Sequence, residues 1–151
     1  MSIKTETFKN RTIFANTMLD RYYSKSPNLI VSDIGTGFGH MKDKIESLNR
    51  KWQPFDSVKK IDETIIWNLN DEGPRGVNNA GIVMFLEVLE HLNKPLLGIQ
   101  NIANHIAEGG FLVLTTPILK SSKNILSLFL RGLLYAFQEK HLIENHVFTP
   151  L

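Results

Sequence analysis

Short apolar runs alternate along the chain with longer stretches in which apolar residues recur at helical spacing. The run at 29–31 is rich in β-branched side chains, and residues 82–86 are apolar without interruption. Both patterns are typical of strands that are buried on the two faces of a sheet. The five predicted strands, in chain order, are 29–31, 52–58, 64–69, 82–86 and 111–115.

Helical periodicity predicts four helices around these strands. Pro27 ends the first helix, Pro95 stands in the first turn of the third, and Gly109-Gly110 closes the third. The first helix packs on the sheet, and it could in addition cover the mouth of a site. The predicted helices span residues 7–23, from directly after Gly39 to about Arg50, 95–107 and 121–141.

Strands that alternate with helices predict an α/β fold, a three-layer α/β/α sandwich around a mainly parallel sheet of about five strands. We predict a single domain over residues 1–151. It is divided into an N-terminal helix at 1–27, a core at 28–117 and a helical region at 118–151. The favoured role of the last helix is packing on the core, and the alternative is a lid or a substrate-binding face.

Composition and charge narrow the class of protein. Apolar residues make up 42% and charged residues 21% of the chain, which is a balance typical of globular domains. A net charge of +2 gives no reason to expect nucleic acid or an anionic membrane as a partner, and without cysteine there is no disulfide or thiol chemistry. The most apolar stretch, 125–137, is too short for a transmembrane segment, and no secretion signal precedes it. We therefore expect a cytoplasmic protein.

Three alternating glycines separate the first predicted strand from the second predicted helix. Asp33 follows the strand, and Gly35, Gly37 and Gly39 come after it. Glycines allow a tight turn and the close approach of a ligand, and the first turn of a helix has unpaired N–H groups. This arrangement predicts the start of a nucleotide-binding βαβ unit. The alternative is a simple turn in which the acid caps the helix.

Three stretches together resemble the class I S-adenosylmethionine-dependent methyltransferases, in particular the type 11-like group. Asp33 with the G-x-G-x-G spacing resembles motif I of that family, whereas dinucleotide folds use G-x-G-x-x-G. Residues 87–92 read E-V-L-E-H-L, which is similar to the signature that follows the family's fourth strand. Residues 108–117 look like its Gly-Gly turn and fifth strand. The resemblance covers about residues 30–117 and implies a Rossmann-like fold with S-adenosylmethionine as cofactor and S-adenosylhomocysteine as product.

The resemblance also implies which residues hold the cofactor. The residues expected to surround its amino-acid and sulfonium end are Asp33, Gly35, Thr36, Gly37, Gly39 and Glu87. Asp56 is expected to accept hydrogen bonds from both ribose hydroxyls, with Asp62 as the alternative acid. Asn68 or Asn70 would accept from the adenine amino group, and Leu69 would lie against the adenine ring.

The chain departs from the family pattern in two places. It has Asn79-Ala80-Gly81 where the family usually has an aspartate at the start of the fourth strand. The family's final two strands should follow residues 147–150, and the sequence lacks them, so we expect a member that is truncated at its C-terminus. An unpaired sheet edge would follow, which could lead to a homo-oligomer.

A metal site is a further hypothesis, which we do not favour. Glu87, Glu90 and His91, with His141 or His146 downstream, resemble a metal-binding signature of some methyltransferases. The alternative is that Glu90 and His91 only cap the turn after the fourth strand. His146 is also a weak candidate for a general base; otherwise no catalytic residue is identified.

The leading functional hypothesis is methyl transfer from S-adenosylmethionine to a small-molecule, saccharide or lipid-linked acceptor. The first alternative is a truncated domain that binds the cofactor in a regulatory role without catalysis. A nicotinamide-dependent oxidoreductase is the weaker alternative, because the third glycine is misplaced for a dinucleotide.

Overall fold

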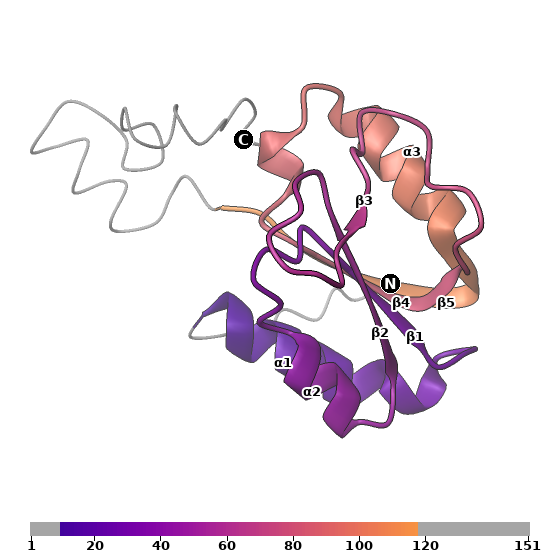
Figure 1. Cartoon of the computed structure of the whole chain (residues 1–151). Coiled ribbons are helices and arrows are strands. Elements are labelled where there is room, and N and C mark those ends of the chain that lie inside the picture. Colours follow the sequence, from indigo (N-terminus) through magenta and orange to yellow (C-terminus); the bar gives the residue numbers. More distant parts are fainter. Residues whose placement is uncertain (1–9, 118–151) are drawn as a thin grey trace, which may run out of the picture.

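The computed structural model describes residues 10–117, and these form a five-stranded parallel sheet between two layers of helices (Figure 1). The strand order is β3-β2-β1-β4-β5, so the predicted α/β fold with a mainly parallel sheet is confirmed. The strands are β1 (Ile30–Ile34), β2 (Lys51–Asp56), β3 (Ile65–Ile66), β4 (Ala80–Leu86) and β5 (Ile106–Thr115). The helices are α1 (Arg11–Tyr22), α2 (Lys42–Ser47) and α3 (Pro95–His105), with short 3-10 turns η1 (Tyr23–Lys25) and η2 (Leu89–His91).

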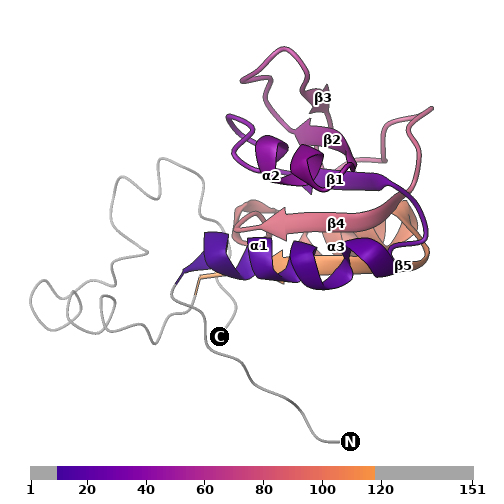
Figure 2. The same cartoon turned by 90° about the horizontal axis from the view of Figure 1, so that it is seen from below.

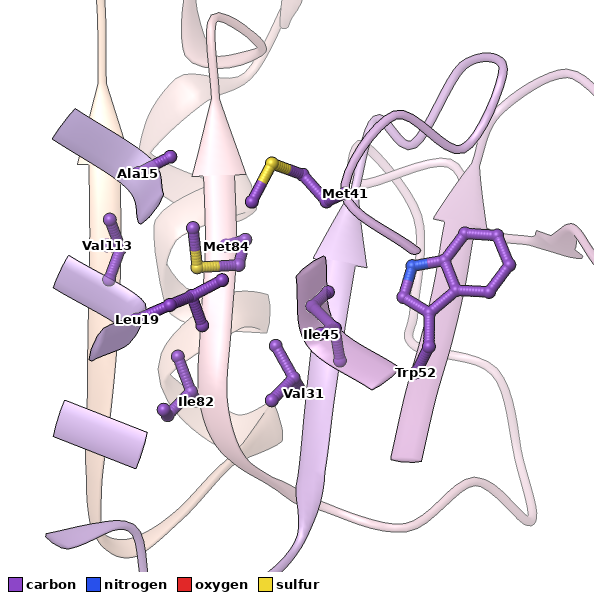
Figure 3. Close-up of a cluster of buried hydrophobic side chains, with 9 residues drawn as sticks. All are labelled: Ala15, Leu19, Val31, Met41, Ile45, Trp52, Ile82, Met84 and Val113. Carbon is purple, nitrogen blue, oxygen red and sulfur yellow. The ribbon is translucent and has the colours of Figure 1, made fainter. Parts of the chain in front are cut away.

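The sheet has an apolar core on each face, because its strands alternate in the direction of their side chains. Helices α1 and α2 cover one face and α3 covers the other (Figures 1 and 2). On β4, Ile82 and Met84 belong to the cluster under α1 and α2, whereas Val83 and Phe85 belong to the cluster under α3. The first cluster, drawn in Figure 3, consists of Ala15, Leu19, Val31, Met41, Ile45, Trp52, Ile82, Met84 and Val113. Burial on both faces explains why residues 82–86 carry no polar side chain.

All five strands differ from their predicted bounds by one or more residues, and β3 and β5 differ most. The predicted strand 64–69 shrinks to Ile65–Ile66, because the Asn68 side chain accepts a hydrogen bond from Asn70 N at 3.0 Å and turns the chain away. Strand β5 begins directly after α3, at Ile106, which pairs with Ala80. Residues 107–110 then lie opposite Gly81 alone before Phe111 pairs with Ile82, so the predicted Gly-Gly turn is a bulge inside the strand.

Helix α1 begins at Arg11, capped by Asn10, whose side-chain oxygen accepts a hydrogen bond from Ile13 N at 2.9 Å. Several predictions concern residues outside the described part. They are the helix start at residue 7, the helix over 121–141, the roles of His141 and His146, and the absence of two further strands. The division into regions 1–27, 28–117 and 118–151 stays a prediction. No helix within residues 10–117 has the length and apolar character needed to cross a bilayer.

Candidate functional site

A cavity of about 390 Å³ opens at the carboxyl ends of β1 and β4. These two central strands are neighbours, but the chain leaves β1 toward β2 on one side and leaves β4 toward β5 on the other. In open α/β sheets, ligands bind at this point of reversal. The residues that line the cavity are Arg11, Thr12, Asp33, Ile34, Gly35, Thr36, Gly37, Phe38, His40, Met41, Leu86 and Glu87.

The glycine loop forms one wall of this cavity and needs glycine at three positions for different reasons. Gly35, Gly37 and Gly39 have φ angles of 73°, 56° and 76°, in the left-handed region that favours glycine. A Cβ on Gly35 would overlap the Val88 side chain, and one on Gly39 would lie 3.1 Å from the Trp52 ring. A Cβ on Gly37 would meet nothing within 4 Å. Gly37 therefore leaves open space beside the cavity, whereas the other two allow close packing.

Asp33 lies at the base of the loop and is 5% exposed. Its Oδ2 accepts hydrogen bonds from Thr36 Oγ1 at 2.8 Å and from Trp52 Nε1 at 3.2 Å. Burial raises the pKa of this carboxyl above its ordinary value, and the two hydrogen bonds act against that increase. The hydrogen bonds hold the carboxylate at the wall of the cavity, where a cationic ligand group would favour its ionised form.

Of the two acids considered for the ribose, Asp56 is joined to the glycine loop. It ends β2, and its Oδ2 accepts a hydrogen bond from Gly37 N at 3.0 Å. Asp62 has a fully exposed side chain, with its carboxylate 3.8 Å from Lys59 Nζ. The structure therefore brings Asp56 beside the cavity but does not bring Asp62 to it.

The residues after β3 do not line the cavity. Asn68 Oδ1 accepts hydrogen bonds from both Asn70 N and Asn70 Nδ2, each at 3.0 Å. Asn70 Oδ1 in turn accepts one from Lys94 N at 3.0 Å. Leu69 is 3% exposed and packs in the core under α3. The three residues thus make contacts within the fold, and their predicted contacts with adenine remain predictions.

Glu87 lines the cavity, and Glu90 lies buried just beyond it. Glu87 has a φ of 58°, an uncommon backbone conformation for a residue other than glycine, immediately after β4. Glu90 in η2 is 1% exposed, and its Oε2 has no hydrogen-bond partner. Burial raises the pKa of Glu90 to about 7. Within residues 10–117 no three His, Asp or Glu side chains are grouped as metal ligands would be. His141 and His146, one of which would complete the metal site, lie beyond this range.

The sequence analysis missed several residues of the cavity. Arg11 and Thr12 reach it from the start of α1, and Phe38, His40 and Met41 reach it from the loop and its end. The hypothesis that the first helix also covers the mouth of a site indicated that residues of this helix could line the cavity. It could not identify the residues, because the angle at which α1 crosses the sheet depends on the packing of Ala15 and Leu19.

The fold of the chain is shared with solved methyltransferase structures. The plantazolicin methyltransferase BpumL, in complex with S-adenosylhomocysteine and a monoazolic desmethyl analogue, aligns with 89% of this chain and 55% of its own, with a TM-score of 0.63 and 14% identity. BpumL with S-adenosylhomocysteine alone gives a TM-score of 0.58 over 89% of this chain and 57% of its own, also at 14% identity. The glycopeptide N-methyltransferase MtfA aligns with 66% of this chain and 52% of its own, with a TM-score of 0.50 and 10% identity.

These similarities establish the Rossmann-like fold that such methyltransferases have. The chain spans about half the length of each of these proteins. The sequence matches no protein-family model and no curated protein.

Proposed function

We propose that the protein is an S-adenosylmethionine-dependent methyltransferase whose cofactor binds in the cavity at the ends of β1 and β4. The observation that carries this proposal is the joined arrangement of Asp33, the open Gly37 and Asp56 around one loop. The same-fold structures of BpumL contain S-adenosylhomocysteine, which supports this ligand class.

The cavity wall suits the proposed cofactor in charge, and the glycine loop leaves room for it. S-adenosylmethionine has a cationic sulfonium and an ammonium group, and Asp33 and Glu87 are acids on the cavity wall. The open space at Gly37 permits the backbone to approach a ligand that a side chain would displace. Asp56 Oδ2 accepts from Gly37 N, and Oδ1 accepts from Val58 N at 3.3 Å and from Ser57 Oγ at 3.5 Å. Ribose hydroxyls would use the remaining acceptor sites of this carboxylate and replace the long contact from Ser57 Oγ.

The residues of the chain would act mainly by positioning. When bound, S-adenosylmethionine supplies an activated methyl group. The wall residues hold the donor so that an acceptor atom can approach in line, and such positioning alone contributes strongly to rate. A general base is required only for an acceptor that must lose a proton. We propose a small-molecule, saccharide or lipid-linked acceptor, and a cytoplasmic location remains a prediction from the sequence.

Calorimetric titration of the full chain with S-adenosylhomocysteine tests the cofactor proposal. We expect binding by the wild type and a loss of binding in Gly37→Val, because the new side chain enters the open space beside the cavity. Gly76→Val is the matched control, since Gly76 also has a positive φ, of 76°, and no atom within 4 Å of an added Cβ, but lies outside this cavity. Equal affinity in all three proteins would refute the proposal, as would selective binding of a nicotinamide dinucleotide.

A methyl-transfer assay with labelled S-adenosylmethionine then separates the enzyme from its main alternative. Turnover with any acceptor of the proposed classes supports the enzyme. Tight cofactor binding without turnover across those classes favours a binding or regulatory domain.

A further inference from the structure

The charged side chains on the cavity wall are of both signs. Asp33 and Glu87 supply carboxylates, and Arg11 supplies the one guanidinium or ammonium group among the lining residues. His40 is the other basic side chain there. A ligand that is only cationic would need the two acids but would have no use for a fixed positive charge at the same wall.

The amino-acid end of the proposed cofactor has both signs of charge, because it combines an α-ammonium with an α-carboxylate. Asp33 and Glu87 match the ammonium, and neither can hold a carboxylate. We propose that Arg11 binds the α-carboxylate of the cofactor's methionine moiety. This inference rests on the proposed function and names a binding residue for it. A guanidinium can donate two parallel hydrogen bonds to a carboxylate, a geometry that lysine does not reproduce.

The fold holds Arg11 at the rim of the cavity from two sides. Asn10 fixes the first turn of α1, since its side chain accepts from Ile13 N at 2.9 Å and its carbonyl accepts from Phe14 N at 3.1 Å. Ala15 and Leu19 are both 0% exposed, so they anchor the helix to the sheet one and two turns later. The backbone of Arg11 is therefore set by the Asn10 cap and by the buried contacts of α1, and neither depends on a ligand.

The Arg11 side chain is available for a ligand. Arg11 is exposed, and within residues 10–117 it makes no hydrogen bond or ion pair. Its charge acts on the nearby Glu90, where it works to lower the pKa of that carboxyl against the stronger effect of burial. The competing explanation is thus that Arg11 serves only as a countercharge for Glu90. That role would affect stability but would not distinguish between ligands.

Two ligands and three variants of the full chain separate these explanations. The ligands are S-adenosylhomocysteine and its decarboxylated analogue, which keeps the ammonium, the thioether and the adenosine. The variants are Arg11→Ala, Arg11→Lys and Arg75→Ala, the last changing an exposed arginine outside the cavity. Calorimetry gives the affinity of each protein for each ligand, and circular dichroism confirms that each variant is folded.

We expect Arg11→Ala to weaken binding of S-adenosylhomocysteine by about 10- to 100-fold and to leave binding of the decarboxylated analogue unchanged. The wild type should discriminate between the two ligands by the same factor, Arg11→Lys should lie between, and Arg75→Ala should match the wild type. An equal effect of Arg11→Ala on both ligands, or none, would overturn the assignment while leaving the cofactor proposal intact. If the wild type binds neither ligand, the proposed function itself fails and the assignment fails with it.

Discussion

The stability of this fold should depend on the protonation of Glu90. This side chain is 1% exposed and its Oε2 has no hydrogen-bond partner, so ionising it in the folded state removes a charge from water. A hydrogen bond with its own backbone and the charge of Arg11 offset this cost only in part. Burial is the main cause of its raised pKa, and the negative charge of Glu87 adds to the effect. The perturbation that tests this is Glu90→Gln, which keeps the shape of the side chain and cannot ionise.

The magnitude follows from the difference in proton affinity between the two states. The pKa of Glu90 is raised from 4.5 to about 7, and each tenfold change in affinity is worth about 1.4 kcal/mol, so the full effect is at most about 3 kcal/mol. The folded state binds the proton more tightly. The contribution is therefore fully present below pH 4.5 and is lost as pH rises through about 7. Between about pH 5 and about pH 8.5, the wild type should lose about 2 to 3 kcal/mol relative to Glu90→Gln.

Urea denaturation of both proteins across this pH range measures the difference. With a slope of about 2 kcal/mol/M, the midpoint of the wild type should fall by about 1 M or more relative to the variant. Burial also raises the pKa of Asp33 and lowers that of His105, so both groups change stability with pH, but they are present in both proteins and cancel in the comparison. Parallel curves for the two proteins would refute the argument, because they would mean that Glu90 ionises as easily in the folded state as in the unfolded chain.

Two further predictions concern the loop and the ribose acid. Gly35→Ala should destabilise the protein by about 1 to 3 kcal/mol more than Gly37→Ala, since both share the cost of a positive φ but only the Cβ at Gly35 overlaps Val88; equal midpoints in urea would contradict this. Asp56→Asn should weaken S-adenosylhomocysteine binding by about 10-fold, because a charged acceptor is lost, whereas Asp62→Asn at the exposed neighbour should leave it unchanged. Calorimetry measures the affinity of the Asp56→Asn and Asp62→Asn variants for S-adenosylhomocysteine. Weaker binding in Asp62→Asn than in Asp56→Asn would assign the ribose hydroxyls to Asp62.

The sequence was sufficient to predict the two central strands, β1 and β4, because each has a clear apolar run. Residues 82–86 are apolar without a break, and the structure buries β4 on both faces between α1 and α3. The stretch 64–69 has a shorter apolar run, at 65–67, yet only Ile65 and Ile66 pair, because the side chain of Asn68 competes for the backbone beyond them. A periodic pattern indicates where a strand can form, but local hydrogen bonds decide where pairing stops.

The cavity was harder to predict, because several of its parts are tertiary contacts. Asp33 and Glu87 follow strands whose carboxyl ends meet, so the sequence could place them together. Trp52 donates its indole N–H to Asp33 from the neighbouring strand, and no short-range sequence pattern predicts that contact. At the other end of the same strands, away from the cavity, the Asn28 side chain makes a second tertiary contact of this kind and accepts from Gly81 N at 2.9 Å. It links the starts of β1 and β4 at the place where the family resemblance implies an aspartate.

The three glycines are not equivalent evidence for a ligand. Gly35 and Gly39 are required by Val88 and Trp52, which are parts of the fold and would demand glycine in a protein that bound nothing. Gly37 has no such neighbour, and its positive φ is its only requirement from the fold. The open space beside it is where a ligand can account for the absence of a side chain. The spacing of the motif therefore identifies the turn, whereas the case for a cofactor depends on Gly37 and on the acids, Asp33 and Asp56, that the turn brings to either side of it.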